Sequence, residues 1–371
     1  MKTTIRMMKV VAFLATLLLS NPAFSYSFVA KDTEAAIVPQ LEQMQRELDR
    51  YYDIQQKGGW KTIKATKKFY QKDVTDPVIT QLKARLRASG EFRSGDDSPK
   101  FTDELVTAVK KAQRLYGFKE NGVVDAALIR ELNRPVEYRI GQLQVNMERL
   151  RALPPATGGT RLVANVPEFK LHVYEGDRHV FDMDIVVGTE ANKTVTFNDE
   201  MNQVVFSPYW NVPPSIVRNE ILPNMRRSRD YLWRNGYVQT GTENGLPVIR
   251  QMPGSKNALG GVKFLFPNSH NIYFHDTPAK SLFQVRRRAF SHGCIRLAEP
   301  AKLAQYLLRD VPGWTAEKIS KAMSAGKEQA VALPAVVPVS ITYFTAWVDK
   351  AGQLHFREDI YGHDKGAIAK R

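Results

Sequence analysis

Phe169-Lys170-Leu171-His172-Val173-Tyr174 alternates apolar with polar side chains, and Glu175-Gly176-Asp177 follows it as a tight turn. Residues Val180 to Val187 form a second run rich in apolar and β-branched residues. Such runs on both sides of a short turn predict two antiparallel strands. Three further runs of this kind are Leu162-Val163, Val204-Val205-Phe206 and Gly261 to Phe266. The sequence therefore predicts a mainly antiparallel β-sandwich with flanking helices over residues 161–330.

A helix and a loop are expected to interrupt this series of strands. Pro213-Pro214-Ser215 places proline at the start of a helix that runs to Met225. Residues 226–247 contain Gly236 and Gly245, so we expect a loop or a small lid over one edge of the sheet there. Residues 216–247 together are a candidate lid over one edge of the sheet.

The N-terminal half of the chain has a helical pattern. Residues 33–56 are polar with a helical rhythm that ends at Gly58-Gly59. Three short helices are then predicted from N-cap signals at Asp76-Pro77, Thr102 and Asp125. Together with the strand pattern, these helices predict a fold of the α+β class, with a helical N-terminal region before the sheet.

The predicted organisation has six parts. They are a signal peptide (1–25), an N-terminal helical segment (26–74), a three-helix domain (75–134), a helix and linker (135–160), the sheet domain (161–330), and C-terminal strands with a tail (331–371).

The first 25 residues have the pattern of an export signal. Lys2, Arg6 and Lys9 precede the apolar run Val10 to Leu19, and Ala23-Phe24-Ser25 offers small residues for cleavage. The apolar run is short for a membrane span, although an uncleaved membrane anchor is the alternative.

The composition of the whole chain, with 43% apolar and 25% charged residues, is typical of a folded, soluble, multi-domain protein. Residues 1–25 carry three basic and no acidic residues, so their removal lowers the formal net charge from +15 to +12. An exported chain with scattered basic residues does not favour nucleic acid as a partner. Anionic cell-envelope polymers or lipid head groups fit the charge better, and a merely solvated basic surface is the alternative.

The segment Ser291-His292-Gly293-Cys294-Ile295-Arg296-Leu297 contains the single cysteine of the chain. A free cysteine often packs as a small apolar residue in a core. An exported protein, however, usually carries cysteines in pairs or none, because a lone thiol is open to oxidation. Cys294 is therefore a candidate thiol nucleophile.

A histidine that can serve this thiol lies upstream, in the predicted strand His270 to Thr277. The period of two places Tyr273 and His275 on one face of that strand and Ile272 and Phe274 on the other. If His275 is the base, we expect a thiolate beside an imidazolium at rest. Glycine before the cysteine allows a sharp turn, so that backbone N–H groups can face a developing oxyanion.

Part of the helical region resembles the peptidoglycan-binding three-helix domain of cell-wall enzymes. The residues that carry the resemblance include Phe101-Thr102-Asp103-Glu104-Leu105-Val106, Tyr116-Gly117, Asn121-Gly122-Val123-Val124 and Leu132-Asn133. The resemblance implies a module that binds glycan strands, and a spacer that no longer binds them is the alternative.

The rest of the chain resembles the L,D-transpeptidases, in the larger periplasmic subgroup that joins such a binding domain to the catalytic one. Besides the histidine strand and the cysteine segment, the matching stretches are Asn165 to Phe169, Val186-Val187-Gly188, Pro208 to Ser215, Ile221-Leu222-Pro223, Asn257 to Gly260 and Tyr343 to Trp347. Residues 161–330 would then form the catalytic domain, and the periplasm is the expected location.

The resemblance implies a role for each residue of the motif. Cys294 would be the nucleophile and His275 its base, oriented by the backbone carbonyl of Asp276. Gly293, Cys294 and the Tyr273 hydroxyl would stabilise the oxyanion.

The other candidate residues have supporting or alternative roles within this resemblance. Ser291 and His292 would be supporting residues of the motif. His292 competes with His275 for the base role, but relatives with serine at its position are active and a strand is the more rigid platform. Arg296 and Arg288 would either hold a substrate carboxylate or form structural salt bridges. The remaining histidines, with no matching role, are His172, His179, His270, His355 and His363.

The reaction implied by the resemblance is the formation of 3-3 cross-links in peptidoglycan. A cysteine thioester forms on a tetrapeptide stem, D-alanine leaves, and the amine of a neighbouring diaminopimelate resolves the thioester. Hydrolysis of the same type of bond by an L,D-carboxypeptidase or amidase is one alternative. A non-catalytic wall-binding protein is the other. No cofactor or metal is implied, because one cysteine and dispersed histidines do not make a ligand set.

Overall fold

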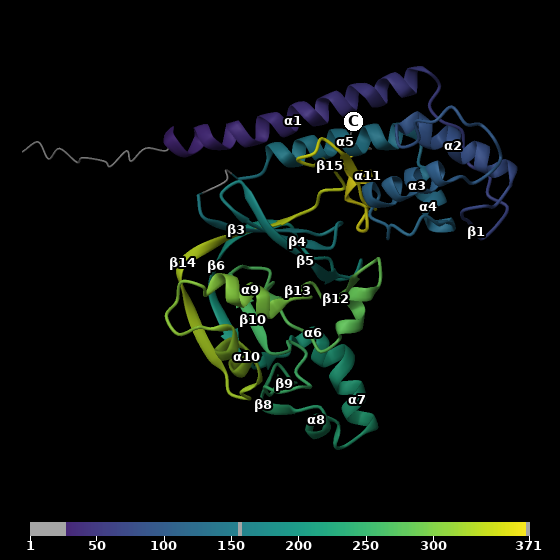
Figure 1. Ribbon diagram of the computed structural model, residues 1–371. Coiled ribbons are helices and arrows are strands. Elements are labelled where there is room, and N and C mark those ends of the chain that lie inside the picture. The colour runs from purple at the N-terminus through teal and green to yellow at the C-terminus, as the bar shows by residue number, and fades with distance from the viewer. Residues whose placement is uncertain (1–26, 155–157, 369–371) are drawn as a thin grey trace, which may run out of the picture.

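The computed structural model describes residues 27–154 and 158–368, so the predicted signal peptide lies outside the described residues. A helical region and a sheet region make up the molecule, as Figure 1 shows. Two helices, α1 (Ser27–Gln56) and α5 (Val136–Arg151), pack side by side next to the sheet region. Within the described residues, no helix is both long and apolar enough to cross a membrane.

The three predicted short helices are present at one end of α1 and α5. They are α2 (Pro77–Ser89), α3 (Asp103–Leu115) and α4 (Ala126–Leu132), joined by the small strand pair β1 (Phe69–Tyr70) and β2 (Val124–Asp125). The N-caps form as expected: the side chains of Asp76, Thr102 and Asp125 accept hydrogen bonds from the first turns. Gly90, in the left-handed conformation at φ 89°, ends α2.

Nine strands form the large sheet of the second region, which is mainly antiparallel as predicted. They are β3 (Thr160–Asn165), β4 (Lys170–Glu175), β5 (Arg178–Gly188), β6 (Phe197–Phe206), β10 (Val262–Leu265), β11 (Phe274–His275), β12 (Ala289–Ser291), β13 (Ile295–Leu297) and β14 (Gln329–Thr342). Their order is β12-β5-β13-β11-β10-β6-β14-β3-β4, and β4 also pairs with β5. The sheet therefore closes around an apolar core.

Short helices flank the sheet, as the sequence predicted. They are α9 (Pro300–Leu307), α10 (Ala316–Ser324) and the 3-10 helix η2 (Lys280–Gln284). Leu303 and Ile319, on α9 and α10, are buried in the same core as the inward-facing strand residues. The sheet itself extends beyond residue 330, because β14 pairs with both β6 and β3.

Residues 226–247, expected to be a loop or a small lid, are largely structured, so the loop alternative was wrong. They contain α8 (Tyr231–Arg234), β8 (Tyr237–Glu243) and the start of β9 (Leu246–Gln251), and β9 also pairs with β7 (Trp210–Asn211). The strand β8 is almost entirely exposed and carries few apolar residues, so it shows no period of two. Asn244-Gly245, both with positive φ, forms the hairpin turn and was the available signal.

This small sheet and the helix before it form a separate unit, which we call the lid subdomain (residues 210–251). Its helix runs without a break from α6 (Pro214–Ile216) through the π-helix η1 (Val217–Ile221) to α7 (Leu222–Arg227). The lid subdomain has its own small core around Val217, Ile221 and Ile249. It lies at the end of the molecule away from the helical region (Figure 1).

The C-terminal segment returns to the helical region. After β14 the chain forms β15 (Ala346–Val348), β16 (Leu354–Phe356) and α11 (His363–Ile368). The apolar residues of β15 and β16 are buried in the core that α1 to α5 share. The two regions are thus joined both by the linker after α5 and by this returning segment.

Candidate active site

Two neighbouring strands bring the predicted site residues together. The strands β11 and β13 pair in parallel, with Phe274 opposite Ile295 and His275 opposite Arg296. Phe274 and Ile295 are fully buried in the sheet core. Because side chains alternate along a strand, Tyr273, His275, Cys294 and Arg296 must share the other face.

The thiol of Cys294 lies against Asn271 and Tyr273. Sγ donates to the carbonyl oxygen of Asn271 at 3.5 Å, and both the backbone N–H and the hydroxyl of Tyr273 interact with the sulfur. The Tyr273 side chain also contacts Trp210 of the lid subdomain. Cys294 is half-buried, so the nucleophile remains reachable from solvent.

His275 is buried and held in one orientation. Its Nδ1 lies 2.5 Å from the backbone carbonyl oxygen of Asp276, in the arrangement expected from the sequence. The Asp276 carboxylate in turn accepts from the N–H of Gly261 and binds Lys280. Since Nδ1 donates to the carbonyl, Nε2 is the ring nitrogen that remains for the thiol. No direct hydrogen bond joins His275 to Cys294 in the described residues, as is common before substrate binds.

The cysteine turn is tied together by Ser291. Ser291 Oγ donates to the carbonyl oxygen of Cys294 at 2.6 Å and accepts from Gly293 N–H at 3.1 Å. The Gly293 N–H is therefore engaged within the turn, contrary to its expected role as an oxyanion donor. Gly293 itself has φ 120°, a conformation that glycine adopts without strain. The N–H of Cys294 and the hydroxyl of Tyr273 remain as candidate oxyanion donors.

His292, the competing base, points to the lid subdomain. Its Nε2 lies 2.7 Å from Glu220 Oε1 on the π-helix η1, and both side chains are about half exposed. His292 therefore connects the cysteine turn with the lid. This geometry favours His275 as the base.

The two arginines differ in their surroundings. Arg288 is nearly buried and bonds the Asp184 carboxylate and the carbonyl oxygens of Phe169 and Ile185. It thus has the structural role that was the alternative to substrate binding. Arg296 has no carboxylate partner in the described part of the chain, and its Nε is buried without an acceptor. Of the pair, only Arg296 is placed to receive a substrate carboxylate.

The residues that support the cysteine turn from behind were not predicted from the sequence. Thr194 is fully buried; its Oγ1 donates to the Gly293 carbonyl at 2.7 Å and accepts from Gly188 N–H at 2.9 Å. The Tyr361 hydroxyl bonds both Gly188 O and Thr194 N–H. These residues lie about 100 positions before and 70 after the turn, and no local pattern could have joined them.

Burial keeps the nucleophile and base neutral at rest. Removal from water raises the pKa of the Cys294 thiol, although Tyr273 and the charge of Arg296 oppose this shift. Burial and then the charge of Arg296 lower the pKa of His275 to about 3. These pKa directions oppose the expected resting thiolate beside an imidazolium, because both charged forms lose hydration in this site.

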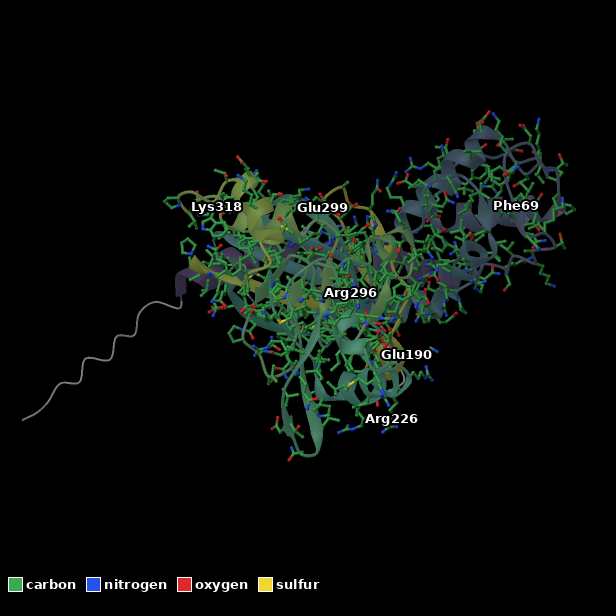
Figure 2. The ribbon with its side chains drawn as sticks, turned by 90° about the horizontal axis from the view of Figure 1, so that it is seen from below. Phe69, Glu190, Arg226, Arg296, Glu299 and Lys318 are labelled. Atoms are coloured by element: carbon green, nitrogen blue, oxygen red, sulfur yellow. The ribbon has the colours of Figure 1, made fainter. Side chains whose placement is uncertain are left out.

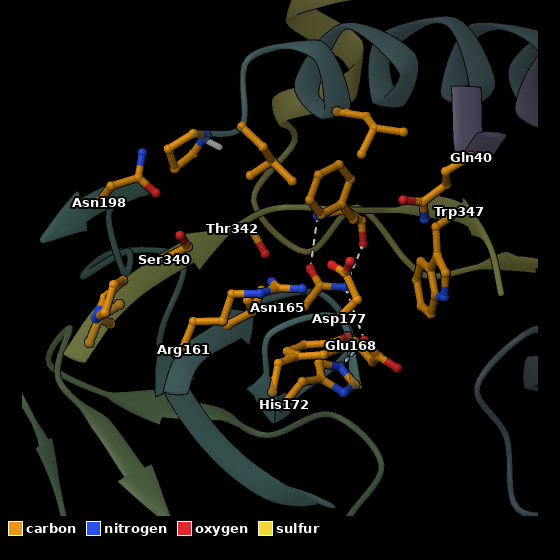
Figure 3. Close-up of a pocket in the computed structure, with 18 of the residues that line it drawn as sticks. Gln40, Arg161, Asn165, Glu168, His172, Asp177, Asn198, Ser340, Thr342 and Trp347 are labelled. Atoms are coloured by element: carbon orange, nitrogen blue, oxygen red, sulfur yellow. Dashed lines mark hydrogen bonds and ion pairs between the residues drawn. The ribbon is translucent and has the colours of Figure 1, made fainter. Parts of the chain in front are cut away.

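The best-formed apolar cavity of the described residues lies away from this chemistry. It has a volume of about 530 Å³ and lies between the paired helices α1 and α5 and the strands β3, β4 and β14 (Figure 3). Its lining includes His172 and Glu168, which are joined by a hydrogen bond of 2.9 Å. None of the predicted site residues lines it.

Comparisons with known proteins agree with the geometry. A family described as "L,D-transpeptidase catalytic domain" matches residues 159–325, which include the whole site. Residues 159–325 are therefore similar to the catalytic domain of L,D-transpeptidases. A second family, described as "Putative peptidoglycan binding domain", matches residues 75–132 in the helical region.

The individual proteins to which the chain is similar share 12–30% sequence identity with it. A Haemophilus influenzae protein described as "Putative L,D-transpeptidase" is 30% identical over 240 residues, 60% of this chain and 48% of the relative. The chain thus spans about half the length of that relative. A solved L,D-transpeptidase from Stackebrandtia nassauensis is 14% identical over 73% of this chain and 94% of its own, with a TM-score of 0.29. One from Mycobacterium smegmatis is 12% identical over 49% and 58%, with a TM-score of 0.27.

The neutral resting state of the thiol predicts a specific pH dependence. Because the thiol pKa is raised, little thiolate exists near pH 7, and alkylation by iodoacetamide should rise only above the free-cysteine value of about 8.5. His275→Ala should leave this profile nearly unchanged, since a neutral imidazole adds no charge. Turnover of that variant should nevertheless fall by roughly two to four orders of magnitude. A midpoint well below 8.5 that moves upward in His275→Ala would instead show a resting ion pair.

Thr194 is expected to position the nucleophile through the Gly293 carbonyl. Thr194→Val keeps the side-chain shape but leaves this carbonyl and the Gly188 N–H without their buried partner. The kcat should fall at least about tenfold, with KM little changed, while Thr194→Ser should retain activity. Steady-state kinetics of the three proteins provide the test. An equal loss in both variants would argue against the hydroxyl as the cause.

Proposed function

We propose that the protein cross-links peptidoglycan by cysteine acyl transfer, forming 3-3 links between diaminopimelate residues. The observation that supports this proposal is the set of polar side chains on one face of the paired strands β11 and β13. There Cys294, His275, Tyr273 and Arg296 lie together within an L,D-transpeptidase catalytic domain. The peptidoglycan-binding domain in the same chain supports peptidoglycan as the substrate partner.

In the first half-reaction Cys294 Sγ attacks the carbonyl carbon at the L-centre of diaminopimelate in a tetrapeptide donor. The thiol proton passes to His275 Nε2 as the C–S bond forms. The carbonyl oxygen becomes an oxyanion, which the Cys294 N–H and the Tyr273 hydroxyl are placed to stabilise. Collapse breaks the C–N bond, and His275 returns the proton to the amine of the leaving D-alanine. A thioester remains on Cys294.

In the second half-reaction the amine of a neighbouring diaminopimelate attacks the thioester carbon. His275 takes a proton from this amine and gives it to the departing Cys294 sulfur, so the enzyme returns to its neutral resting state. Water competes with the amine at this step and would give an L,D-carboxypeptidase instead. The contacts of Glu220 with His292 and of Trp210 with Tyr273 bring the lid subdomain against the nucleophile, which supports a role in limiting water.

The unpaired Arg296 suits the recognition of a donor stem. A substrate carboxylate bound to its guanidinium would satisfy the buried Nε. It would also offset the charge that lowers the pKa of His275. Binding of the correct substrate would then make His275 a stronger base at the moment of attack.

The protein is proposed to act in the periplasm. The basic, apolar and small-residue pattern of residues 1–25 supports export. The same apolar run supports an association with the inner membrane if the signal is not cleaved.

The proposed reaction is tested by incubating purified protein with a defined disaccharide tetrapeptide and weighing the products. A transpeptidase gives a cross-linked dimer with loss of one D-alanine, whereas a carboxypeptidase gives the tripeptide. Cys294→Ala should give neither product and no covalent adduct, and should remain folded because only a sulfur atom is lost. Full turnover by Cys294→Ala would overturn the proposed mechanism. A wild-type protein that binds the substrate without converting it would indicate a wall-binding protein.

A further inference from the structure

A second cavity, of about 590 Å³, lies between the peptidoglycan-binding domain and the catalytic domain. We call it the interdomain groove. One wall is the end of α3 and the loop after it, residues 114–120, and the other includes residues 284–288 and 357–358. The two walls meet where the Arg286 guanidinium lies 4.5 Å from the centre of the Phe118 ring. A cation over an aromatic face is a favourable contact that holds the walls together.

The lining of the groove carries more positive than negative charge. Seven basic and four acidic side chains line it, an excess of three positive charges. Asp184 Oδ1 is shared, because it contacts both Lys170 at 3.1 Å and Arg288 at 3.0 Å. Lys170 also binds Asp182, which lies outside the lining, at 2.9 Å, so the uncompensated charge at this end belongs mainly to Arg288. Each shared carboxylate leaves part of its partners' charge uncompensated.

A similar excess occurs at the open side of the groove. The single carboxylate of Glu358 lies 3.6 Å from Arg286 and 3.7 Å from Arg287. Both arginines are nearly half exposed, so an anion can reach them. Lys119, on the opposite wall, has no acidic partner among the described residues. A bound anion would therefore meet cations from both domains.

The groove lies close to the nucleophile along the chain. Its residues 284–288 lead directly into β12, which ends at Ser291 in the cysteine turn. Arg288 and Cys294 are six positions apart, so their Cα atoms are at most about 20 Å apart. A four-residue stem peptide spans about 14 Å when extended. A strand held in the groove can thus present its stems near Cys294.

We propose that the interdomain groove binds the carboxylates of stem peptides on a peptidoglycan strand that the peptidoglycan-binding domain has captured. This inference rests on the proposed function and names where the polymer lies between the two domains. Phosphates of anionic lipids share the same charge chemistry. A concave groove between two domains admits a flexible strand, however, whereas a flat bilayer surface cannot enter it.

The test compares two double variants of the full chain that remove the same charge. Lys119→Gln/Arg287→Gln removes one cation from each wall and touches no residue of the catalytic face. The control, Lys318→Gln/Lys321→Gln, removes two exposed cations from α10. In Figure 2, Lys318 lies on the opposite side of the molecule from Phe69, which marks the far end of the helical region. A third variant, Lys119→Arg/Arg287→Lys, keeps the charge of the groove.

Binding to purified sacculi and to vesicles of anionic phospholipid is measured over a range of salt concentrations. The groove variant should bind sacculi about fivefold to tenfold more weakly than the wild type, with a smaller dependence on salt. The control and the charge-conserving variant should bind within about twofold of the wild type. Turnover of the soluble disaccharide tetrapeptide by the control variant and by the charge-conserving variant should equal that of the wild type.

Two results would overturn the groove assignment. One is equal sacculus binding by the groove and control variants. The other is a loss restricted to vesicle binding, which would assign the groove to a lipid surface. Failure of the wild type to convert the soluble substrate, with sacculus binding and its groove dependence intact, would reject the proposed reaction but not the groove.

Discussion

The parallel register of β11 and β13 places a histidine and a cysteine, nineteen positions apart in sequence, on one face of the same sheet. Burial of Phe274 and Ile295 on the opposite face maintains this register. A slip by one residue would expose both apolar side chains and turn His275 or Cys294 into the core. The strand β13 is in turn held by β5, the strand through which the sheet closes. Closure of the sheet around its core therefore supports the geometry of the site.

The same burial that orients these groups also determines their charge. A thiol and an imidazole placed between strands, with the lid subdomain against them, lose the hydration that their ions need. Burial makes His275 a weak base at rest, since it lowers the pKa of this residue to about 3. The same burial keeps the thiol protonated, and a protonated thiol is less readily oxidised than a free thiolate. Under the proposed mechanism, reactivity appears only when a substrate carboxylate approaches Arg296.

Sequence patterns predicted the elements whose signals are local. Caps, apolar spacing and turn residues identified the helices of the N-terminal half, and the period of two identified the strands around Phe169 and His275. The hairpin in the lid subdomain was missed because β8 is exposed on both faces and lacks an apolar period. The hydrogen bonds of Gly293 could not be predicted, since Thr194 comes from a loop far away in sequence. The role of Arg288 likewise depends on partners that only the fold brings together, Asp184, Phe169 and Ile185. Arg296 differs from it because its buried Nε has no acceptor in the described residues.

The C-terminal segment after β14 contacts both the helical region and the sheet region. Buried Asp364 binds Arg149 of α5 at 2.7 Å and accepts from Thr345 at the same distance. A few residues away, the Tyr361 hydroxyl bonds the Thr194 N–H behind the cysteine turn. The segment that completes the helical core thus also supports the nucleophile. Because of these contacts, and because β15 and β16 lie in the helical core, the binding domain is not an independent attachment. Its orientation toward the catalytic face is fixed by buried contacts, as the proposed delivery of a strand through the interdomain groove requires.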